Sequence, residues 1–362
     1  MNLQNLIALK KTEFVTALLI FVLITLTVLS SRLIRLTSNS AIYFEQETEL
    51  IFNSLSELDS LQLKLNRQGI EFDKEELEWA TSILGWRRYQ RGRYVFEGGY
   101  SYNAFLSKMT KGIQDPSSVV ILPGIMPERL AEIVAENFYF SKDDLYQALT
   151  DSTYLAENNL SAEQLFGRMF PNTYLMYWTT SPKGFIDKVL REFESAITDE
   201  FRLRAQELGY SMDEIITLAS IVEWEAKNQE EKPRISGLYW NRLNRGMRLQ
   251  ADPTINYVLG ERRRLLFEDY QIDHPFNTYM NSGLPPGPIT NPSLSTIEAT
   301  LYPEDHDYLY MVANPEGGHV FTETFREHQI ESEKWRIWLR EQYRIKRELE
   351  NRQKEANDST AL

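Results

Sequence analysis

An uninterrupted apolar run near the N-terminus constrains this chain more than any other feature. No charged residue occurs from Phe14 to Ser31, and the run FVTALLIFVLITLTVL is almost wholly apolar. As a helix, the 18 residues from Phe14 to Ser31 would extend about 27 Å. That length is close to the roughly 30 Å thickness of bilayer hydrocarbon. We therefore predict an uncleaved membrane-spanning helix over residues 14–34, preceded by a short segment over residues 1–13.

A cleaved signal peptide is the alternative interpretation of this run, with Lys10 and Lys11 as its charged start. The small residues that could form a cleavage site lie well beyond the apolar run, and Arg32 and Arg35 intervene. The anchor is therefore favoured. The two lysines on one side balance the two arginines on the other, so the flanking charges do not orient the helix.

The composition excludes several kinds of chemistry. The 39 Lys and Arg residues against 52 Asp and Glu residues leave a formal charge of −13, which disfavours a nucleic-acid binder. The absence of cysteine excludes disulfides, thiol nucleophiles and cysteine-ligated zinc. With only 4 histidines a histidine-rich metal centre is improbable as well. We expect no metal and no cofactor.

The 362 residues are enough for two or three domains. Residues 36–118 have the mixture of patterns typical of a small α/β unit. Within it a second strand leads through a glycine-rich turn into a helix that stops near Gly112. The predicted strands are Ala41–Phe44 and Arg93–Phe96, and the predicted helices are Glu57–Arg67 and Asp73–Leu84.

Residues 119–331 have the pattern of a larger mixed domain, so the fold class is α+β. Residues 332–362 form a charged C-terminal helix and tail, and the helix is expected over 332–355 with a solvated surface. A turn at Pro315–Gly318 separates two short strands near the end of the larger domain. The elements predicted for 119–331 are strands Val119–Leu122, Tyr308–Val312 and His319–Phe321 and helices Pro127–Asn137, Asp143–Thr150, Ser161–Phe166 and Lys183–Glu207.

The segment most suited to chemistry is a helix that begins after Ser211. Ser211 and Glu214 have the spacing of a capping box, and the sequence IITLASIVEWEAK that follows is apolar on nearly every face. Glu223 continues an apolar stripe at helical spacing, and Glu225 lies about 200° further round the helix. Both glutamates are thus expected on a buried helix.

A carboxyl on an apolar face is desolvated, which raises its pKa and lets it serve as a general acid near neutral pH. We therefore predict a raised pKa for Glu223. The alternative is that one of the two glutamates is salt-bridged to Lys227, Lys232 or Arg234 and only holds the fold. The residues alone leave this alternative open.

Polar residues become dense after this helix. The segments NRLNRGMRLQADPT and HPFNTYMNSGLPPGPITNP combine amides, hydroxyls, aromatics and several prolines. Prolines at this density favour a stiff extended loop, and such a loop suits a sugar, which offers hydroxyl groups and an apolar ring face. A purely structural loop is the alternative. A metal pair of His319 and His328, with His306 as a third ligand, fits no zinc spacing and is disfavoured.

Four segments resemble the endolytic murein transglycosylase family, the YceG-like or MltG-type proteins. They are ITLASIVEWEA, GLYWNRLNRGMRLQADPTINY, PFNTYMNSGLPPGPITNPS and DYLYMVANPEGGHVFTETFREH, in the family order over residues 216–328. LFGRMFPNTY and GRYVFEGGYSYNAFLSKMTKG also match in character. The chain departs from the family pattern at Trp224, where relatives usually carry a polar or charged residue, and at LPG 122–124, where relatives tend to have PEG.

The resemblance implies a single-pass protein of the inner or cytoplasmic membrane. Its N-terminus would be cytoplasmic and its catalytic domain periplasmic or extracytoplasmic. Residues 36–118 would be a LysM-like subdomain and residues 119–331 the transglycosylase catalytic domain. Implied partners are peptidoglycan glycan strands and, by resemblance, penicillin-binding proteins and other cell-wall synthases.

The implied reaction is endolytic cleavage of the β-1,4 bond between N-acetylmuramic acid and N-acetylglucosamine in nascent strands, with a 1,6-anhydro end, which ends strand elongation. The family's catalytic glutamate is matched to Glu223, and Glu225 is given a supporting role. Further substrate-binding or supporting residues are Gln250, Asp252, Asn277, Tyr279 and His319. Two alternatives remain: a two-carboxylate hydrolase in which Asp252 activates water, and a membrane-anchored peptidoglycan-binding scaffold without turnover.

Overall fold

The computed structural model describes residues 11–226 and 228–360, which form two compact units. The first comprises residues up to Ser118 together with 137–139 and 175–180, and the second comprises the remainder. Most of the expected segment 1–13, including Lys10, lies outside the described residues, as does Lys227. The fold is mixed α+β, as expected.

The first unit begins with α1 (Lys11–Thr37). Its stretch Glu13–Thr37 is the one helix, within the part of the chain that the structure describes, that is long and apolar enough to cross a membrane, and none of it is buried. The hydroxyls of Thr25 and Thr27 donate to the carbonyls of Phe21 and Leu23, each at 2.8 Å. These bonds satisfy the two hydroxyl groups within the helix itself. The helix fits a single-pass membrane anchor.

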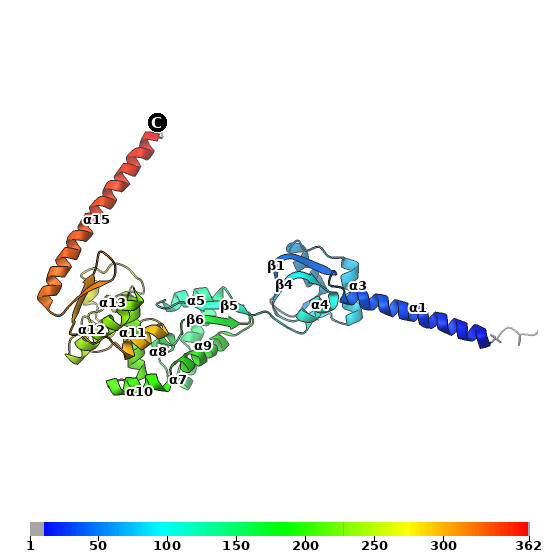
Figure 1. Cartoon of the computed structure of the whole chain (residues 1–362), viewed down its shortest axis with the longest axis horizontal. Coiled ribbons are helices and arrows are strands. Elements are labelled where there is room, and N and C mark those ends of the chain that lie inside the picture. The colour runs from blue at the N-terminus through cyan, green and yellow to red at the C-terminus, as the bar shows by residue number, and fades with distance from the viewer. Residues whose placement is uncertain (1–10, 227, 361–362) are drawn as a thin grey trace, which may run out of the picture. The chain divides into compact units, whose positions relative to one another are not determined.

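The core of the first unit lies between one antiparallel strand pair and three helices. In Figure 1, β1 and β4 lie side by side, with α4 next to them. Stacked and tilted rings of Phe44, Phe96 and Phe105 join the strands to α4. The elements are β1 (Ile42–Phe52), β2 (Ser56–Glu57), α2 (Leu58–Arg67), α3 (Lys74–Leu84), β3 (Arg88–Tyr89), β4 (Gly92–Tyr100) and α4 (Tyr102–Thr110).

The expected glycine-rich turn after Arg93–Phe96 is wrong, because β4 continues through both glycines to Tyr100. Gly98 has a φ of 75° and pairs with Phe44, where the register with β1 shifts. A glycine adopts this left-handed backbone without strain, so the pair Gly98-Gly99 bends the strand rather than ending it. The helix α4 then begins after its N-cap Ser101, whose hydroxyl accepts from the backbone N–H of Ala104.

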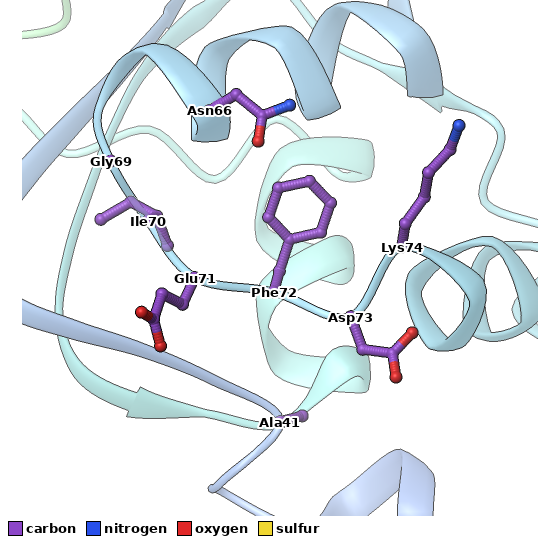
Figure 2. A pocket seen from close by; sticks show the side chains of 8 residues that line it. All are labelled: Ala41, Asn66, Gly69, Ile70, Glu71, Phe72, Asp73 and Lys74. Carbon is purple, nitrogen blue, oxygen red and sulfur yellow. The ribbon is translucent and has the colours of Figure 1, made fainter.

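A pocket of about 870 Å³ opens beside the connection between α2 and α3. Figure 2 shows the side chains of Asn66, Phe72 and Lys74 around it, with Glu71 and Asp73 on the same connecting segment. The pocket therefore combines one aromatic ring with amide, ammonium and carboxylate groups.

The second unit is largely helical and contains the strand pair β7 with β8. The strands β5 and β6, which pair with each other, each have residues in both units. In this unit α11 packs against α12, α13 and α14, and α6 packs against α5 and α9. Up to residue 208 the elements are β5 (Ser117–Ile121), α5 (Pro127–Ala135), α6 (Lys142–Leu149), α7 (Ser152–Asn158), α8 (Ala162–Gly167), β6 (Asn172–Met176), α9 (Pro182–Ala196) and α10 (Asp199–Leu208).

Beyond residue 208 come the elements that carry the site. They are α11 (Met212–Glu225), η2 (Gln229–Glu231), α12 (Lys232–Asn244), α13 (Asp252–Leu259), η3 (Asp269–Gln271), α14 (Leu294–Leu301), β7 (Tyr310–Ala313), β8 (His319–Thr322) and α15 (Phe325–Thr360).

The single helix expected over Lys183–Glu207 is wrong, because the chain forms α9 and α10 there. Ile197 leaves the helical region with a ψ of 93°. Thr198 then caps α10 by accepting from the N–H of Phe201 at 3.3 Å. A threonine at this position can start a new helix, and the amphipathic pattern does not reveal the break because both helices bury one face.

Candidate active site

The buried helix α11 carries two glutamates near its C-terminal end. Ser211 and Glu214 form the expected capping box: the Ser211 hydroxyl accepts from the Glu214 N–H at 3.3 Å, and Glu214 accepts from the Ser211 N–H at 2.8 Å. The helix ends at Glu225, and Ala226 is extended. Glu223 and Glu225 therefore both lie in the last turn, on different faces of the helix.

The Glu223 carboxylate is fully engaged by groups from two other helices. Lys232, whose side chain is 3% exposed, donates to its two oxygens at 3.1 and 3.3 Å. Ser293, the N-cap of α14, donates its backbone N–H at 2.9 Å and its hydroxyl at 2.8 Å, and Thr296 donates its hydroxyl. An anion at a helix N-terminus is stabilised further by the helix dipole.

These donors reverse the expected pKa shift of Glu223. Burial alone would raise its pKa, but the hydrogen bonds from Thr296 and Ser293 and the charge of Lys232 together hold the pKa below its ordinary value. The prediction of a raised pKa is therefore wrong. The alternative interpretation, a salt bridge to a nearby basic residue, agrees with the contacts of Glu223, and its partner is Lys232.

Glu225 has the environment that was expected of Glu223. It lines a cavity of about 400 Å³ and accepts a hydrogen bond from the Tyr239 hydroxyl at 3.0 Å. Burial, followed by the negative charge of Asp252, raises the pKa of Glu225 to about 7, although Tyr239, Arg242 and Arg262 act in the opposite direction. At neutral pH a large fraction of Glu225 is thus protonated.

Four of the other predicted site residues line the same cavity: Gln250, Asp252, Tyr279 and His319. Asp252 is the first residue of α13, and its carboxylate accepts from the Tyr279 hydroxyl at 2.5 Å. Glu231 accepts from the backbone N–H of His319 at 2.7 Å and lies 3.4 Å from its Nδ1. Residues far apart in the sequence thus meet around Glu225.

Asn277 is not among the residues that line this cavity. It is fully buried, and its side-chain amide donates to the carbonyls of Tyr270 and Ile272 at 3.1 and 2.8 Å. Its side-chain oxygen accepts from the N–H of Tyr279 at 2.9 Å. Asn277 therefore shapes the loop that presents Tyr279.

Sequence reasoning missed several residues of the cavity wall. Tyr239 and Arg242 come from α12, one helical turn apart, on the side that faces Glu225. Arg242 donates to the backbone carbonyls of Leu309 and Leu249, each at 2.6 Å, and so joins α12 to the strand pair and to the segment before α13. The tyrosine and the arginine three positions apart in YWNRLNR were the available signal. The remaining lining residues are Leu238, Leu249, Tyr310, Met311, Val312, Ala313, Phe325 and His328.

The trio of histidines considered as metal ligands is not brought together as one site. His306 lies 2.9 Å from the carbonyl of Arg234 through its Nε2, while His319 and His328 line the cavity. Within residues 11–226 and 228–360, no group of three histidines and carboxylates could hold a metal ion.

Trp224, between the two glutamates, connects α11 to the turn after β5. Its indole N–H donates to the carbonyl of Gly124 at 2.7 Å. The turn is held in place by Asn291, a fully buried residue whose carbonyl accepts from the Gly124 N–H at 3.1 Å. Gly124 has a φ of 68°, and a Cβ there would lie 3.2 Å from the Trp224 ring. The segment LPG thus fits this tryptophan.

Comparison with known proteins gives a consistent result. The model of the YceG-like family matches residues 53–334. A protein of Bacillus subtilis named endolytic murein transglycosylase is 28% identical over 296 residues, which is 77% of this chain and 82% of that protein. A protein of the same name from Streptococcus pneumoniae serotype 2 is 33% identical over 199 residues, 53% of this chain and 36% of that longer protein.

A solved structure resembles the fold as well. The crystal structure of a putative YceG-like protein from Listeria monocytogenes superposes with a TM-score of 0.57 at 26% sequence identity. It covers 78% of this chain and 98% of the Listeria chain. The similarity therefore extends over most of both chains.

Proposed function

This chain belongs to the YceG-like family, and we propose that it is a membrane-anchored lytic transglycosylase that cuts peptidoglycan glycan strands at internal positions. The family model covers more than three quarters of the sequence, and the curated relatives carry the name of this activity. The bond cleaved is the β-1,4 bond between N-acetylmuramic acid and N-acetylglucosamine. Cleavage of nascent strands would end their elongation.

The general acid in this proposal is Glu225. The observation that carries the assignment is the contrast within the last turn of α11: Glu225 lines the cavity with its pKa raised to about 7, whereas Glu223 is engaged by Lys232 and by α14. A general acid works best when its pKa is near the working pH. A carboxylate that is held ionised by a buried ammonium group is poorly suited to donating a proton.

The reaction needs only this one carboxyl group. Glu225 donates its proton to the glycosidic oxygen as the bond from C1 of the muramic acid breaks, so that the N-acetylglucosamine leaves with a hydroxyl group. The resulting carboxylate then takes the proton of the muramic acid 6-hydroxyl, whose oxygen attacks C1. The product is a 1,6-anhydro end, no water is consumed, and Glu225 is protonated again.

The other polar residues of the cavity have binding roles in this proposal. Asp252, paired with the Tyr279 hydroxyl, and Gln250 offer hydrogen bonds to sugar hydroxyls, and His319 is oriented by Glu231. Glu223 becomes a supporting residue, and Asn277 supports Tyr279 from within the loop.

The assignment is tested by the same substitution at two positions of one helix. Glu225→Gln should lower the formation of anhydro-ended muropeptides from purified strands by at least about 100-fold, with the far-ultraviolet circular dichroism spectrum unchanged. Glu223→Gln, the matched control, should keep measurable cleavage under conditions in which its circular dichroism spectrum shows that it is folded. The reverse result, with Glu223→Gln inactive but folded and Glu225→Gln active, would return the acid role to Glu223.

Mass spectrometry of the products separates the lyase from the two-carboxylate hydrolase. A hydrolase with Asp252 as base would leave reducing ends heavier by one water. Asp252 is near enough to raise the pKa of Glu225, so this alternative has an observation in its favour. Anhydro ends alone support the lyase, and reducing ends alone support the hydrolase.

Residues 36–118 are proposed to be a LysM-like subdomain. The order strand, helix, helix, strand and the antiparallel pairing of β1 with β4 support this. Binding of strands by the protein without any new chain ends would favour the scaffold alternative, in which the pocket around Phe72 (Figure 2) carries the interaction.

The proposed orientation has the N-terminus in the cytoplasm and the catalytic domain outside the membrane, where strands emerge from penicillin-binding proteins and other synthases. Because the chain contains no cysteine, single cysteines report on this directly. An impermeant maleimide applied to spheroplasts should label Leu203→Cys, an exposed position in α10, and not Asn2→Cys. The opposite labelling pattern would reverse the orientation.

A further inference from the structure

An exposed arginine lies beside the proposed acid, and none of the described carboxylates pairs with it. Arg262 follows α13, and its guanidinium carbon lies 4.8 Å from the centre of the Trp224 ring. Its Nη2 also makes a long contact of 3.4 Å with the Trp224 carbonyl. The charge of Arg262 reaches Glu225, whose pKa it lowers. The arginine is therefore adjacent to the reaction centre without being part of the cavity wall.

The neighbouring arginine, Arg263, is paired with carboxylates. Arg263 donates to both carboxylate oxygens of Asp269, at 2.7 and 2.8 Å, and to Glu261 at 2.9 Å. Among the residues that the structure describes, no carboxylate forms an ion pair with Arg262. The loop thus places one neutralised arginine and one available arginine in succession.

The ring under Arg262 is buried and hydrogen-bonded. Trp224 is 7% exposed, and its indole N–H is fixed by the carbonyl of Gly124 at 2.7 Å. A guanidinium group that is stacked on a fixed ring is positioned in advance, so that less side-chain entropy is lost when it binds an anion. The free edge of such a group presents N–H donors in the fork geometry that matches a carboxylate.

We propose that Arg262, stacked on Trp224, is a subsite for a carboxylate group of the glycan strand next to the bond that is cut. The inference rests on the proposed function, because it takes the strand as the ligand. A strand carries carboxylates from two sources, the lactyl group of muramic acid where the stem peptide is absent and the peptide itself where it is present. The chemistry recognised by Arg262 is the same in both.

The charges around the cavity give a reason for such a subsite. Glu225 and Asp252 make this region acidic, and Arg242 is committed to the backbone carbonyls of Leu249 and Leu309. An anionic strand would be repelled unless a cation met its carboxylate. When the substrate neutralises Arg262, the arginine depresses the pKa of Glu225 less, which favours the protonated acid in the complex.

The test measures binding rather than turnover, so that it does not depend on the identity of the acid. The full-length chain in detergent, carrying Glu225→Gln, is titrated with three probes: peptide-bearing strands, strands stripped of peptides by an amidase, and strands whose carboxylates have been converted to amides. The parent should bind the carboxylate strands about tenfold more tightly than the amidated strands, which corresponds to about 1.4 kcal/mol.

In Arg262→Ala this preference should disappear, and in Arg262→Lys only part of it should remain because the fork is lost. Arg264→Ala is the matched control: it removes the same charge from the same exposed loop and should keep the preference. Loss of the preference only with stripped strands identifies the lactyl carboxylate, and loss only with peptide-bearing strands identifies the peptide.

Two outcomes would overturn the subsite. One is a parent that binds carboxylate and amidated strands equally. The other is an Arg262→Ala variant that keeps the full preference. Either result leaves the lyase assignment intact, since that depends on anhydro ends formed by the active chain. Conversely, a cleaving Glu225→Gln variant would refute the acid assignment while the binding contrast could still be measured.

Discussion

Lys232, the first residue of α12, donates to both carboxylate oxygens of Glu223, at 3.1 and 3.3 Å, from a position where its own side chain is 3% exposed. The pair is closed further by the N-terminus of α14, since Ser293 donates to the same carboxylate. One ionised group thus ties the end of α11 to two other helices. Two residues further on, Glu225 is left to face the cavity.

Breaking this ion pair should destabilise the fold. Glu223→Gln would leave the buried ammonium group of Lys232 without a counter-charge, and loss of one partner of a buried pair costs about 3–5 kcal/mol. We expect a lower midpoint of urea unfolding for Glu223→Gln. The double variant Glu223→Gln with Lys232→Met should recover most of the loss, because no unpaired charge remains. A double variant as unstable as the single one would contradict this explanation.

The ion pair of Glu223 with Lys232 also predicts how the free energy of unfolding depends on pH. The pKa of Glu223 is lower in the folded chain than in the unfolded chain, so its stabilising contribution is complete above the unfolded value near 4.5 and is lost as the pH falls through the folded value. Unfolding free energies measured between pH 6 and pH 3 should fall less steeply for Glu223→Gln than for the parent. Equal slopes would show that the carboxylate is not held ionised by the fold.

Glu225 predicts the opposite dependence. Its pKa is raised from 4.5 to about 7 in the folded chain, so its ionisation costs stability as the pH rises from about 4.5 to 7. At pH 8, Glu225→Gln should therefore be more stable than the parent, by up to about 3 kcal/mol. The catalytic group would then be retained at the expense of stability, and a variant less stable than the parent at pH 8 would argue against a neutral Glu225.

Activity should report the protonation of Glu225. Because the acid must be protonated, kcat/KM should decline as the pH rises through about 7. Asp252→Asn removes a like charge, which lowers the pKa of Glu225 and moves this decline to lower pH. Tyr239→Phe removes a hydrogen bond that lowers the pKa, and should move the decline to higher pH. Shifts of the same sign in both variants would refute this account.

Gly124 is predicted to be required for the position of Trp224. In Gly124→Ala the alanine would have to adopt a φ of 68°, and its Cβ would lie 3.2 Å from the indole ring. The backbone strain and the displacement of the tryptophan would each cost free energy. Gly209→Ala, with a φ of 84° and no atom within 4 Å of its Cβ, is the control that carries strain alone. Thermal unfolding should show that Gly124→Ala is the less stable of the two variants. A muropeptide assay should show that it also cleaves strands more slowly.

Local sequence patterns predicted much of the chain because their causes are local. The apolar run lies within α1, and the Ser211 capping box starts α11. The patterns failed where two consecutive helices have the same periodicity as one long helix. The residues of α9 and α10 predict a single helix, because the cap at Thr198 does not interrupt the amphipathic stripe.

The sequence by itself determined that two glutamates would lie on different faces of one buried helix, and it associated them with the polar segments that follow. Only the tertiary structure decided which carboxyl remains available. Ser293 and Glu223 are separated by 70 positions in the chain, and neither their contact nor that of Lys232 follows from helical periodicity. A pKa depends on the donors and charges that the whole fold brings to a side chain, and here they ionise Glu223 and raise the pKa of Glu225.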